Sequence, residues 1–234
     1  MLRRFLCLSA LCVVAHAPGA HAVDPVKRIR IEVTPYYQAA RIPDDPPLIA
    51  VAPKLDPLLV SARADDILRA RDEIERDPGR ITPMTLMVLA IRLYDVGLRD
   101  DAVFWFYAAK NRYYILSRVA NMKSPELASI GAAMDAFARV AGSVINGYAY
   151  CNIERQREIA LKAADWTARH AYEALLMEEV PALPGNREQN YQKALADLFA
   201  NVKRERDYLA VPTNANRLRE MRAQNDADAR YCWK

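Results

Sequence analysis

Apolar residues recur at every third or fourth position over most of the chain that follows residue 60. This spacing places them on one face of an α-helix. The clearest case is "TPMTLMVLAIRLYDVG", where Thr82 suits the N-cap, Pro83 suits the first turn and Gly97 ends the segment. About seven segments share the pattern, and they lie at 61–79, 82–97, from 100 onward, and at 124–147, 151–179, 186–210 and 214–234. The pattern predicts an all-α fold, a compact bundle of helical hairpins.

Residues 23–60 carry a different pattern. In "KRIRIEV" the side chains of Ile29, Ile31 and Val33 alternate with charged ones, which is the period of a β-strand. Prolines at positions 43, 46, 47, 53 and 57 then exclude a long helix. We expect an extended N-terminal arm, with room for a small hairpin between 27–33 and 48–52. Because a lone strand leaves backbone groups unpaired, this arm must lie on the helical domain, residues 61–234.

The first 22 residues have the layout of a secretory signal peptide. A basic start, "MLRR", precedes the apolar run "FLCLSALCVVAHA", which is too short to span a bilayer, and "AHA" offers a cleavage site at Ala22. We expect removal of residues 1–22, export to the periplasm and no transmembrane segment in the mature chain. An uncleaved membrane anchor is the alternative interpretation.

Removal of this segment changes the count of cysteines and charges. Of four cysteines, Cys151 and Cys232 remain, and two cysteines in an exported chain predict one disulfide. Two free thiols or an intermolecular bridge are the alternatives. Without Arg3 and Arg4 the 33 basic residues become 31, against 29 acidic ones. This balance, with no long basic block, argues against nucleic-acid binding.

Four aromatic residues stand side by side at Phe104–Tyr107, within one helical turn. Successive residues on a helix are turned by about 100°. One face, with Trp105 and Phe106, therefore packs on the preceding helix, while the opposite face needs another cover. The chain's own arm or a later helix can supply it, and we favour the arm; the alternative is a partner protein. The candidate partner-binding residues on this back face are Phe104, Tyr107, Asn111, Tyr114 and Arg118.

The chain lacks the residue patterns of common catalytic and metal sites. The mature chain keeps one histidine, His170, and no cluster of histidines and cysteines for zinc or copper. It has no Gly-x-Ser-x-Gly motif and too few glycines for a phosphate-binding loop or a dinucleotide fingerprint. Helix capping explains the carboxylates Asp95, Asp100 and Asp101 more simply than a glycosidase pair does. We therefore expect no catalytic residues, no cofactor and no metal.

Residues 82–113 resemble a single tetratricopeptide or Sel1-like repeat. The resemblance rests on Gly97 between two helices and on Ala102, Phe106 and Ala109 at the spacing that packs the second helix on the first. It covers one hairpin, whereas repeat proteins need about three to bury their faces. The resemblance implies a helical-hairpin module and protein binding.

The combination of signal peptide, one disulfide and helical body is similar in type to periplasmic immunity proteins. That likeness implies a protein that occludes a secreted antibacterial effector. An envelope structural or assembly factor is the first alternative, and a helical enzyme acting on peptidoglycan is the second.

Overall fold

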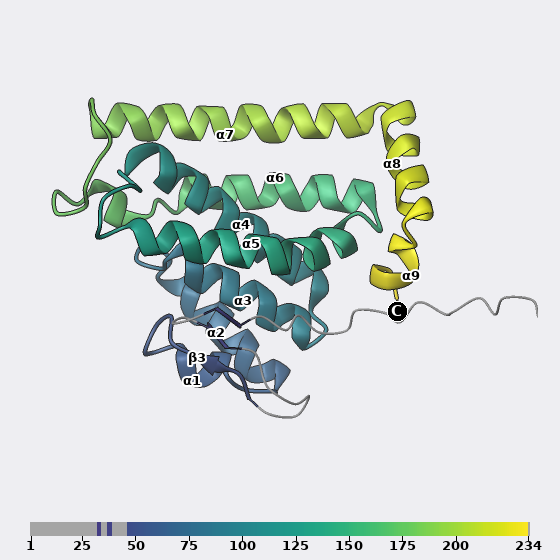
Figure 1. The fold of residues 1–234 in the computed structure, drawn as a ribbon, viewed down its shortest axis with the longest axis horizontal. Coiled ribbons are helices and arrows are strands. Elements are labelled where there is room, and N and C mark those ends of the chain that lie inside the picture. The colour runs from purple at the N-terminus through teal and green to yellow at the C-terminus, as the bar shows by residue number, and fades with distance from the viewer. Residues whose placement is uncertain (1–31, 34–36, 39–45, 234) are drawn as a thin grey trace, which may run out of the picture.

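The computed structural model describes residues 32–33, 37–38 and 46–233, and it confirms the all-α fold (Figure 1). The signal peptide and cleavage site expected at residues 1–22 lie outside this part of the chain. The helices are α1 (Asp56–Leu59), α2 (Ala64–Arg76), α3 (Pro83–Asp95), α4 (Arg99–Val119), α5 (Ala128–Ala149), α6 (Ile153–Arg169), the 3-10 helix η1 (Glu173–Leu176), α7 (Arg187–Ala210), α8 (Pro212–Gln224) and α9 (Ala227–Tyr231).

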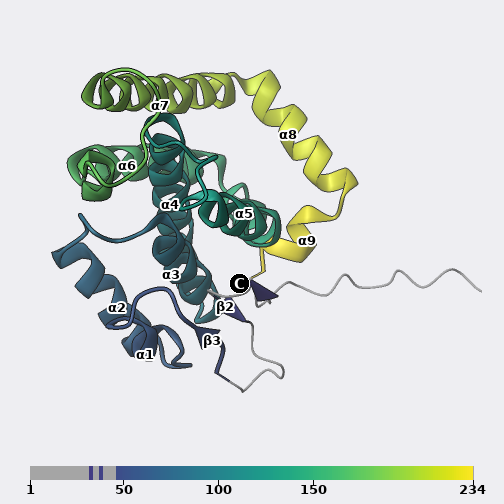
Figure 2. The same ribbon diagram turned by 60° about the vertical axis from the view of Figure 1, so that its left-hand side comes forward.

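Helix α4 is the centre of the molecule. Helices α3, α5, α6 and α7 all pack against it. Figure 2 shows α3 below α4, α7 above it, and α5 and α6 on either side. A helix that is apolar all round must be covered on all sides. The aromatic turn at the middle of α4 supplies that apolar surface.

The α3–α4 hairpin forms the core, as the pattern predicts. Every residue of α3 from Pro83 to Tyr94 is buried. The Thr82 hydroxyl accepts a hydrogen bond from the Thr85 amide at 3.0 Å, which caps the start of α3. Gly97 has φ +87°, a left-handed conformation that reverses the chain between the two helices.

The N-terminal segment lies on α3, on the side away from α7 (Figure 1). Three two-residue strands, β1 (Glu32–Val33), β2 (Tyr37–Gln38) and β3 (Leu48–Ile49), form an antiparallel sheet in the order β1-β2-β3. The expected hairpin between 27–33 and 48–52 is therefore wrong in its pairing, because β2 lies between the two. Residue 33 reaches β2 through a short connection, which costs less loop entropy than closing directly on β3.

Two predicted helices are shorter than their apolar patterns. The segment 151–179 ends its helix at Arg169, because the His170 carbonyl leaves the helical direction and accepts a hydrogen bond from Arg112 at 2.9 Å. The segment 214–234 splits into α8 and α9 at Asp226, which has φ 50°. This turn brings α9 back against α5, where the Tyr231 ring lies so close to Gly147 that a Cβ there would sit 2.6 Å away.

Three arginines fix the irregular segments by binding backbone carbonyl groups. Arg92 donates to the carbonyls of Leu59 and Ser61 beside α1. Arg112 is buried and donates to the carbonyls of Pro78, Ile81 and His170. Arg187 donates to the carbonyls of Leu175 and Val180. Carbonyl groups outside helices need such donors when they are withdrawn from water.

Within the described residues, α5 is the one helix long and apolar enough to cross a membrane by length and composition. It packs against α3, α4, α6 and α9, and its side chains Phe137, Ala141 and Ile145 are fully buried. A core helix of a bundle meets the same criterion through such a buried face.

Candidate functional site

The aromatic turn of α4 is covered by a later helix of the same chain. Trp105, Phe106 and Tyr107 are buried. The Trp105 ring packs edge-on against Trp166 of α6, with 5.1 Å between ring centroids. The arm that we favoured as the cover instead contacts α3, and through β1 also α5, in the part of the chain that the structure describes. The arm uses its apolar side chains Leu55 and Leu59 in the core beside α3, whereas α6 brings Trp166 to the aromatic turn.

The five candidate partner-binding residues do not form one surface. Phe104 is half-buried against Trp166, and Tyr107 is buried beneath α6, where its hydroxyl oxygen accepts a hydrogen bond from Gln156 at 3.2 Å. Tyr114 is half-buried against the cluster that α4 forms with α7, and the exposed Arg118 lies over its ring. Tyr107 and Asn111 both line a cavity, so these two candidates lead to a site.

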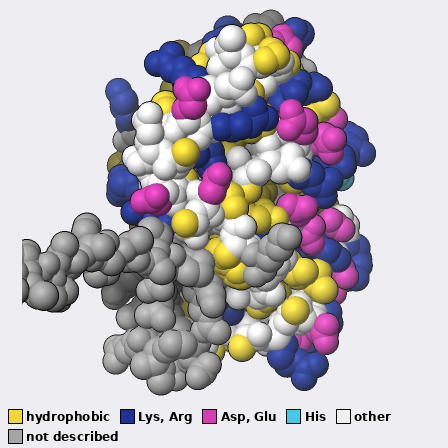
Figure 3. Space-filling model, turned by 90° about the vertical axis from the view of Figure 1, so that its right-hand side faces the viewer, with side chains coloured by type: hydrophobic (Ala, Val, Ile, Leu, Met, Phe, Trp, Pro, Cys, Tyr) yellow, Lys and Arg dark blue, Asp and Glu magenta, His cyan; other side chains and the backbone are white. Residues whose placement is uncertain are grey.

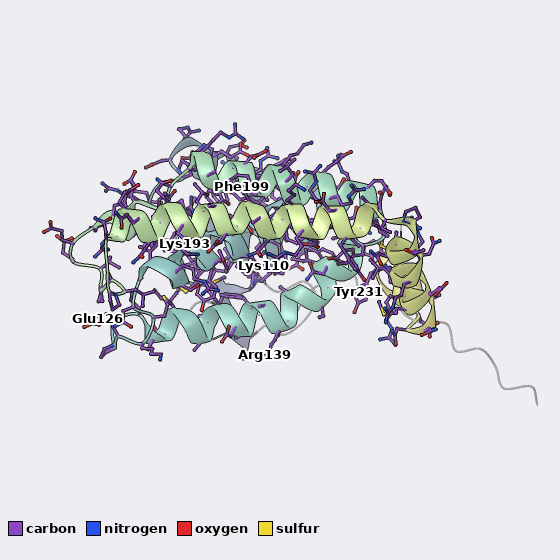
Figure 4. The ribbon with its side chains drawn as sticks, turned by 90° about the horizontal axis from the view of Figure 1, so that it is seen from above. Lys110, Glu126, Arg139, Lys193, Phe199 and Tyr231 are labelled. Atoms are coloured by element: carbon purple, nitrogen blue, oxygen red, sulfur yellow. A yellow bond between two sulfur atoms is a disulfide. The ribbon has the colours of Figure 1, made fainter. Side chains whose placement is uncertain are left out.

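This cavity is polar and lies where four helices meet. It has a volume of about 140 Å³. Its lining residues are Tyr107, Lys110 and Asn111 from α4, Asn146 and Tyr150 at the end of α5, Ala160 from α6, and Val202 and Glu205 from α7. Figure 4 shows Lys110 between α5 and α7. The cavity holds one cationic and one anionic side chain.

One tyrosine and one glutamine hold the carboxylate of Glu205 by hydrogen bonds. The Tyr150 hydroxyl donates to Glu205 Oε1 at 2.8 Å, and Gln156 Nε2 donates to the same oxygen at 3.2 Å. Burial raises the pKa of Tyr107 and of Tyr150, and the negative charge of Glu205 adds to the increase in both. Both phenols therefore stay protonated at physiological pH.

The charge of Lys110 is not paired with a carboxylate within the described part of the chain. Lys110 is an exposed residue, yet the surrounding helices reduce its hydration and lower the pKa of its ammonium group. The Glu205 carboxylate partly offsets this effect. Lys110 Nζ lies 5.4 Å from the centroid of the Phe106 ring and 5.8 Å from that of Tyr107. It forms no ion pair within the described part of the chain, and it lines the cavity.

A larger, mainly apolar cavity adjoins the polar one at the corner between α7 and α8. It has a volume of about 310 Å³ and shares Tyr150 and Glu205 with its neighbour. Its other lining residues are Tyr208, Leu209, Asn214, Arg217, Leu218 and Met221. Tyr208 is 52% exposed and Met221 45%. Figure 3, which faces the end of the molecule formed by α8 and α9, shows hydrophobic side chains among Lys and Arg there.

Sequence reasoning missed most of these residues. Lys110 lies one helical turn after Tyr107 and beside Asn111, so the back-face pattern could have included it. Glu205 and Tyr208 stand among charged residues, a pattern that is typical of a solvated helix face. Nothing local to Tyr150 indicates that α7 and α8 come to lie beside it.

The chain is related to a protein of Haemophilus influenzae. It is 31% identical over 210 residues to an uncharacterized protein of strain ATCC 51907 / DSM 11121 / KW20 / Rd. The alignment covers 90% of this chain and 81% of that protein. The chain belongs to the family of this Haemophilus protein. No family model and no solved structure matches it.

In this family member a disulfide lies beside α8, the helix that supplies part of the lining of the apolar cavity. Cys151 and Cys232 are bonded, with 5.6 Å between their Cα atoms, which confirms the predicted pair. Arg222 of α8 is buried beside the bond and donates toward both sulfurs, and it pairs with Asp228 at 2.7 Å. The bond thus ties the segment after α9 to the start of α6 and holds α8 in place.

The side chains that the sequence analysis considered for catalysis each contact a different residue. The His170 ring lies tilted against the Trp166 ring, with 4.9 Å between ring centroids. Asp100 pairs with Arg155, and Asp101 pairs with Arg71. Within the described residues no group of three or more His, Cys, Asp or Glu side chains could hold a metal ion.

Proposed function

We propose that this protein is a non-catalytic binding protein of the periplasm, which holds a partner protein at the corner between α7 and α8. The observation that carries the proposal is the apolar cavity of about 310 Å³ with exposed Tyr208 and Met221 at its rim. Exposed apolar side chains around a concave site are typical of interaction surfaces.

The charges around this corner favour a polypeptide partner. Arg217 and Glu205 flank the apolar side chains of Leu209, Leu218 and Met221. A protein surface offers apolar side chains together with backbone amides, carbonyls and charged groups that match both signs. Tyrosine, methionine and arginine are also enriched at protein interfaces.

The signal-peptide layout and the disulfide support a periplasmic location. A disulfide-bonded pair is compatible with an exported protein. In this compartment the proposed role is that of an immunity protein, which occludes a secreted antibacterial effector. An envelope assembly factor is the competing role, and it would use the same surface.

Site-specific crosslinking in living cells tests the binding surface. A photoreactive phenylalanine placed at Tyr208 should crosslink to one periplasmic protein, whereas the same residue at Met177 should not. Met177 is 50% exposed on another part of the surface. The crosslinked protein is identified by mass spectrometry, and its purified form must then bind the parent chain.

A matched pair of substitutions completes the test. Met221→Glu should weaken binding of that purified partner at least about tenfold, since it places a charge at the centre of an apolar contact. Met177→Glu should leave the affinity unchanged. Equal effects of both variants, or equal crosslinking from both positions, would show that the corner is not the binding surface.

The immunity role has its own test. Cells that lack this protein should be killed by neighbouring cells that deliver the effector, and should survive when the parent chain, but not Met221→Glu, is restored. Survival of the deletion strain beside every such competitor, together with a crosslinked partner from the envelope machinery, would favour the assembly role.

A further inference from the structure

The polar cavity presents two opposite charges that do not neutralise each other. Lys110 and Glu205 both line it. The Glu205 carboxylate partly offsets the lowering of the Lys110 pKa, so the two charges interact electrostatically. They form no ion pair in the described part of the chain. Both residues are exposed, so both charges are available to a ligand that enters the cavity. The cavity between them therefore suits a ligand that carries both signs.

The side-chain amide of Asn111 favours the same kind of ligand. Asn111 Nδ2 is buried and has no hydrogen-bond partner among the described residues. Asn111 follows Lys110 directly on α4 and lines the same cavity. A lysine ammonium and an amide N–H together bind a carboxylate. On the other side, Glu205 accepts two hydrogen bonds through Oε1, and its second oxygen can accept from a cationic donor.

The apolar cavity supplies the third element of recognition. It lies beside the polar one, since Tyr150 and Glu205 line both cavities. Beyond them lie Leu209, Leu218 and Met221. A ligand held between Lys110 and Glu205 can therefore place an apolar substituent in this second space, where burial is favourable.

We infer that the two cavities form a binding site for a free α-amino acid with a large apolar side chain. The carboxylate lies at Lys110 and Asn111, the ammonium group at Glu205, and the side chain in the apolar cavity. In an α-amino acid both charged groups are attached to one carbon, so a single small ligand meets a cation and an anion on opposite walls. This site goes beyond the proposed binding of a protein.

A peptide C-terminus is the competing ligand. It would offer the same carboxylate and side chain, but its amide nitrogen is neutral and gives Glu205 no cationic partner. A fatty acid has no nitrogen for Glu205 at all. The charge balance of the cavity favours the zwitterion over both.

Calorimetry with the mature full-length chain tests the site with four probes. Leucine should bind. N-acetyl-leucine, which lacks the ammonium group, and leucinamide, which lacks the carboxylate, should each bind at least about tenfold more weakly, because each loses one charge-assisted interaction. Alanine should also bind more weakly, since its methyl group does not reach the apolar cavity. Equal binding of N-acetyl-leucine and leucine would assign the site to a peptide C-terminus and overturn the inference, as would no heat from leucine at millimolar concentration.

Variants connect each ligand group to its residue. Lys110→Met should weaken leucine at least about tenfold and leave leucinamide unchanged. Glu205→Gln should weaken leucine and leave N-acetyl-leucine unchanged. The matched controls are Lys193→Met and Asp197→Asn, which break an exposed ion pair on α7 outside both cavities (Figure 4). These controls should bind leucine like the parent.

A further variant and the melting temperatures distinguish loss of leucine binding from loss of the fold. Tyr150→Phe removes the hydrogen bond that orients Glu205 and keeps the ring, so it should weaken leucine while the melting temperature of each variant confirms the fold. Equal leucine affinity of Lys110→Met and Lys193→Met would overturn the inference. Crosslinking from Tyr208 would still stand in that case, because it does not require Lys110.

Discussion

At the scale of single residues, burial decides what each aromatic side chain does. Tyr107 and Tyr208 are both helical tyrosines in charged or aromatic surroundings, yet Tyr107 is 8% exposed and Tyr208 is 52% exposed. The first belongs to the packing of α4 against α6, and the second belongs to the rim of the apolar cavity. The same residue type therefore serves stability at one position and recognition at the other.

The two tyrosines give a matched prediction. Tyr107→Ala should lower the free energy of unfolding by about 3 kcal/mol, because it removes a buried ring and leaves a cavity beneath α6. Tyr208→Ala should change it by no more than about 0.5 kcal/mol, as is usual at the surface. Denaturant unfolding measures both. A Tyr107→Ala variant as stable as the parent would mean that α6 does not cover this ring.

At the scale of elements, turns and hydrogen bonds from arginines to backbone carbonyls determine where the helices end. The amphipathic pattern continues past Arg169, but the helix stops because Arg112 binds the carbonyl of His170. The α3–α4 hairpin depends on its glycine in the same local way. Gly97 has positive φ, and a Cβ added there would meet nothing within 4 Å.

Gly97→Ala should therefore destabilise the protein through its backbone alone. The expected loss is about 1 kcal/mol, the cost of placing an L side chain in the left-handed region. Gly131→Ala in α5 is the control, since Gly131 is helical and its added Cβ would meet only the Tyr113 hydroxyl at 3.5 Å. It should be neutral or stabilising by about 0.5–1 kcal/mol. Thermal melts of the two variants that shift in the same direction would contradict this account.

The disulfide acts on the elements that wall the apolar cavity. It closes a loop with a sequence separation of 81, so the double variant Cys151→Ser/Cys232→Ser should lose about 4 kcal/mol in the chain-entropy model. Hydrogen exchange should rise first in α8 and α9, because they depend on this bond, and stay slow in α3 and α4. A reductant should lower the melting temperature of the parent and leave the double variant unchanged. Uniform exchange throughout the chain would argue against such a local role.

At the scale of the whole molecule, one central helix organises a bundle whose last helices form the proposed binding corner. Helix α8 stands across the ends of α5, α6 and α7 (Figure 1), and Arg99 of α4 binds the Trp233 carbonyl at 2.6 Å. The C-terminal end thus rests on the start of the central helix. The corner is held by the core and remains open to solvent.

The mature molecule should begin near Val23. The basic, apolar and small residues before it have the order that a signal peptidase recognises. Intact-mass measurement of the protein isolated from periplasm should give the mass of residues 23–234 with one disulfide. A mass that includes residues 1–22, or that of an attached lipid, would contradict export by cleavage.

The sequence by itself determined the all-α class, most helix positions and the disulfide pair. These features depend on local periodicity, capping residues and a count of cysteines, all of which one stretch of chain carries. It also placed Asn111 on the back face of α4, one residue from Lys110. It did not fix the pairing of the short strands or the place where α6 stops.

Only the tertiary structure decided what covers the aromatic turn and where the candidate site lies. Lys110, Tyr150, Glu205 and Met221 come from α4, the end of α5, α7 and α8. Their meeting depends on how these helices cross, which is set by side-chain packing across the whole bundle and not by any one segment. The periodicity of apolar residues determines which face of each helix is buried. Which element covers that face depends on how all the helices pack together in one core.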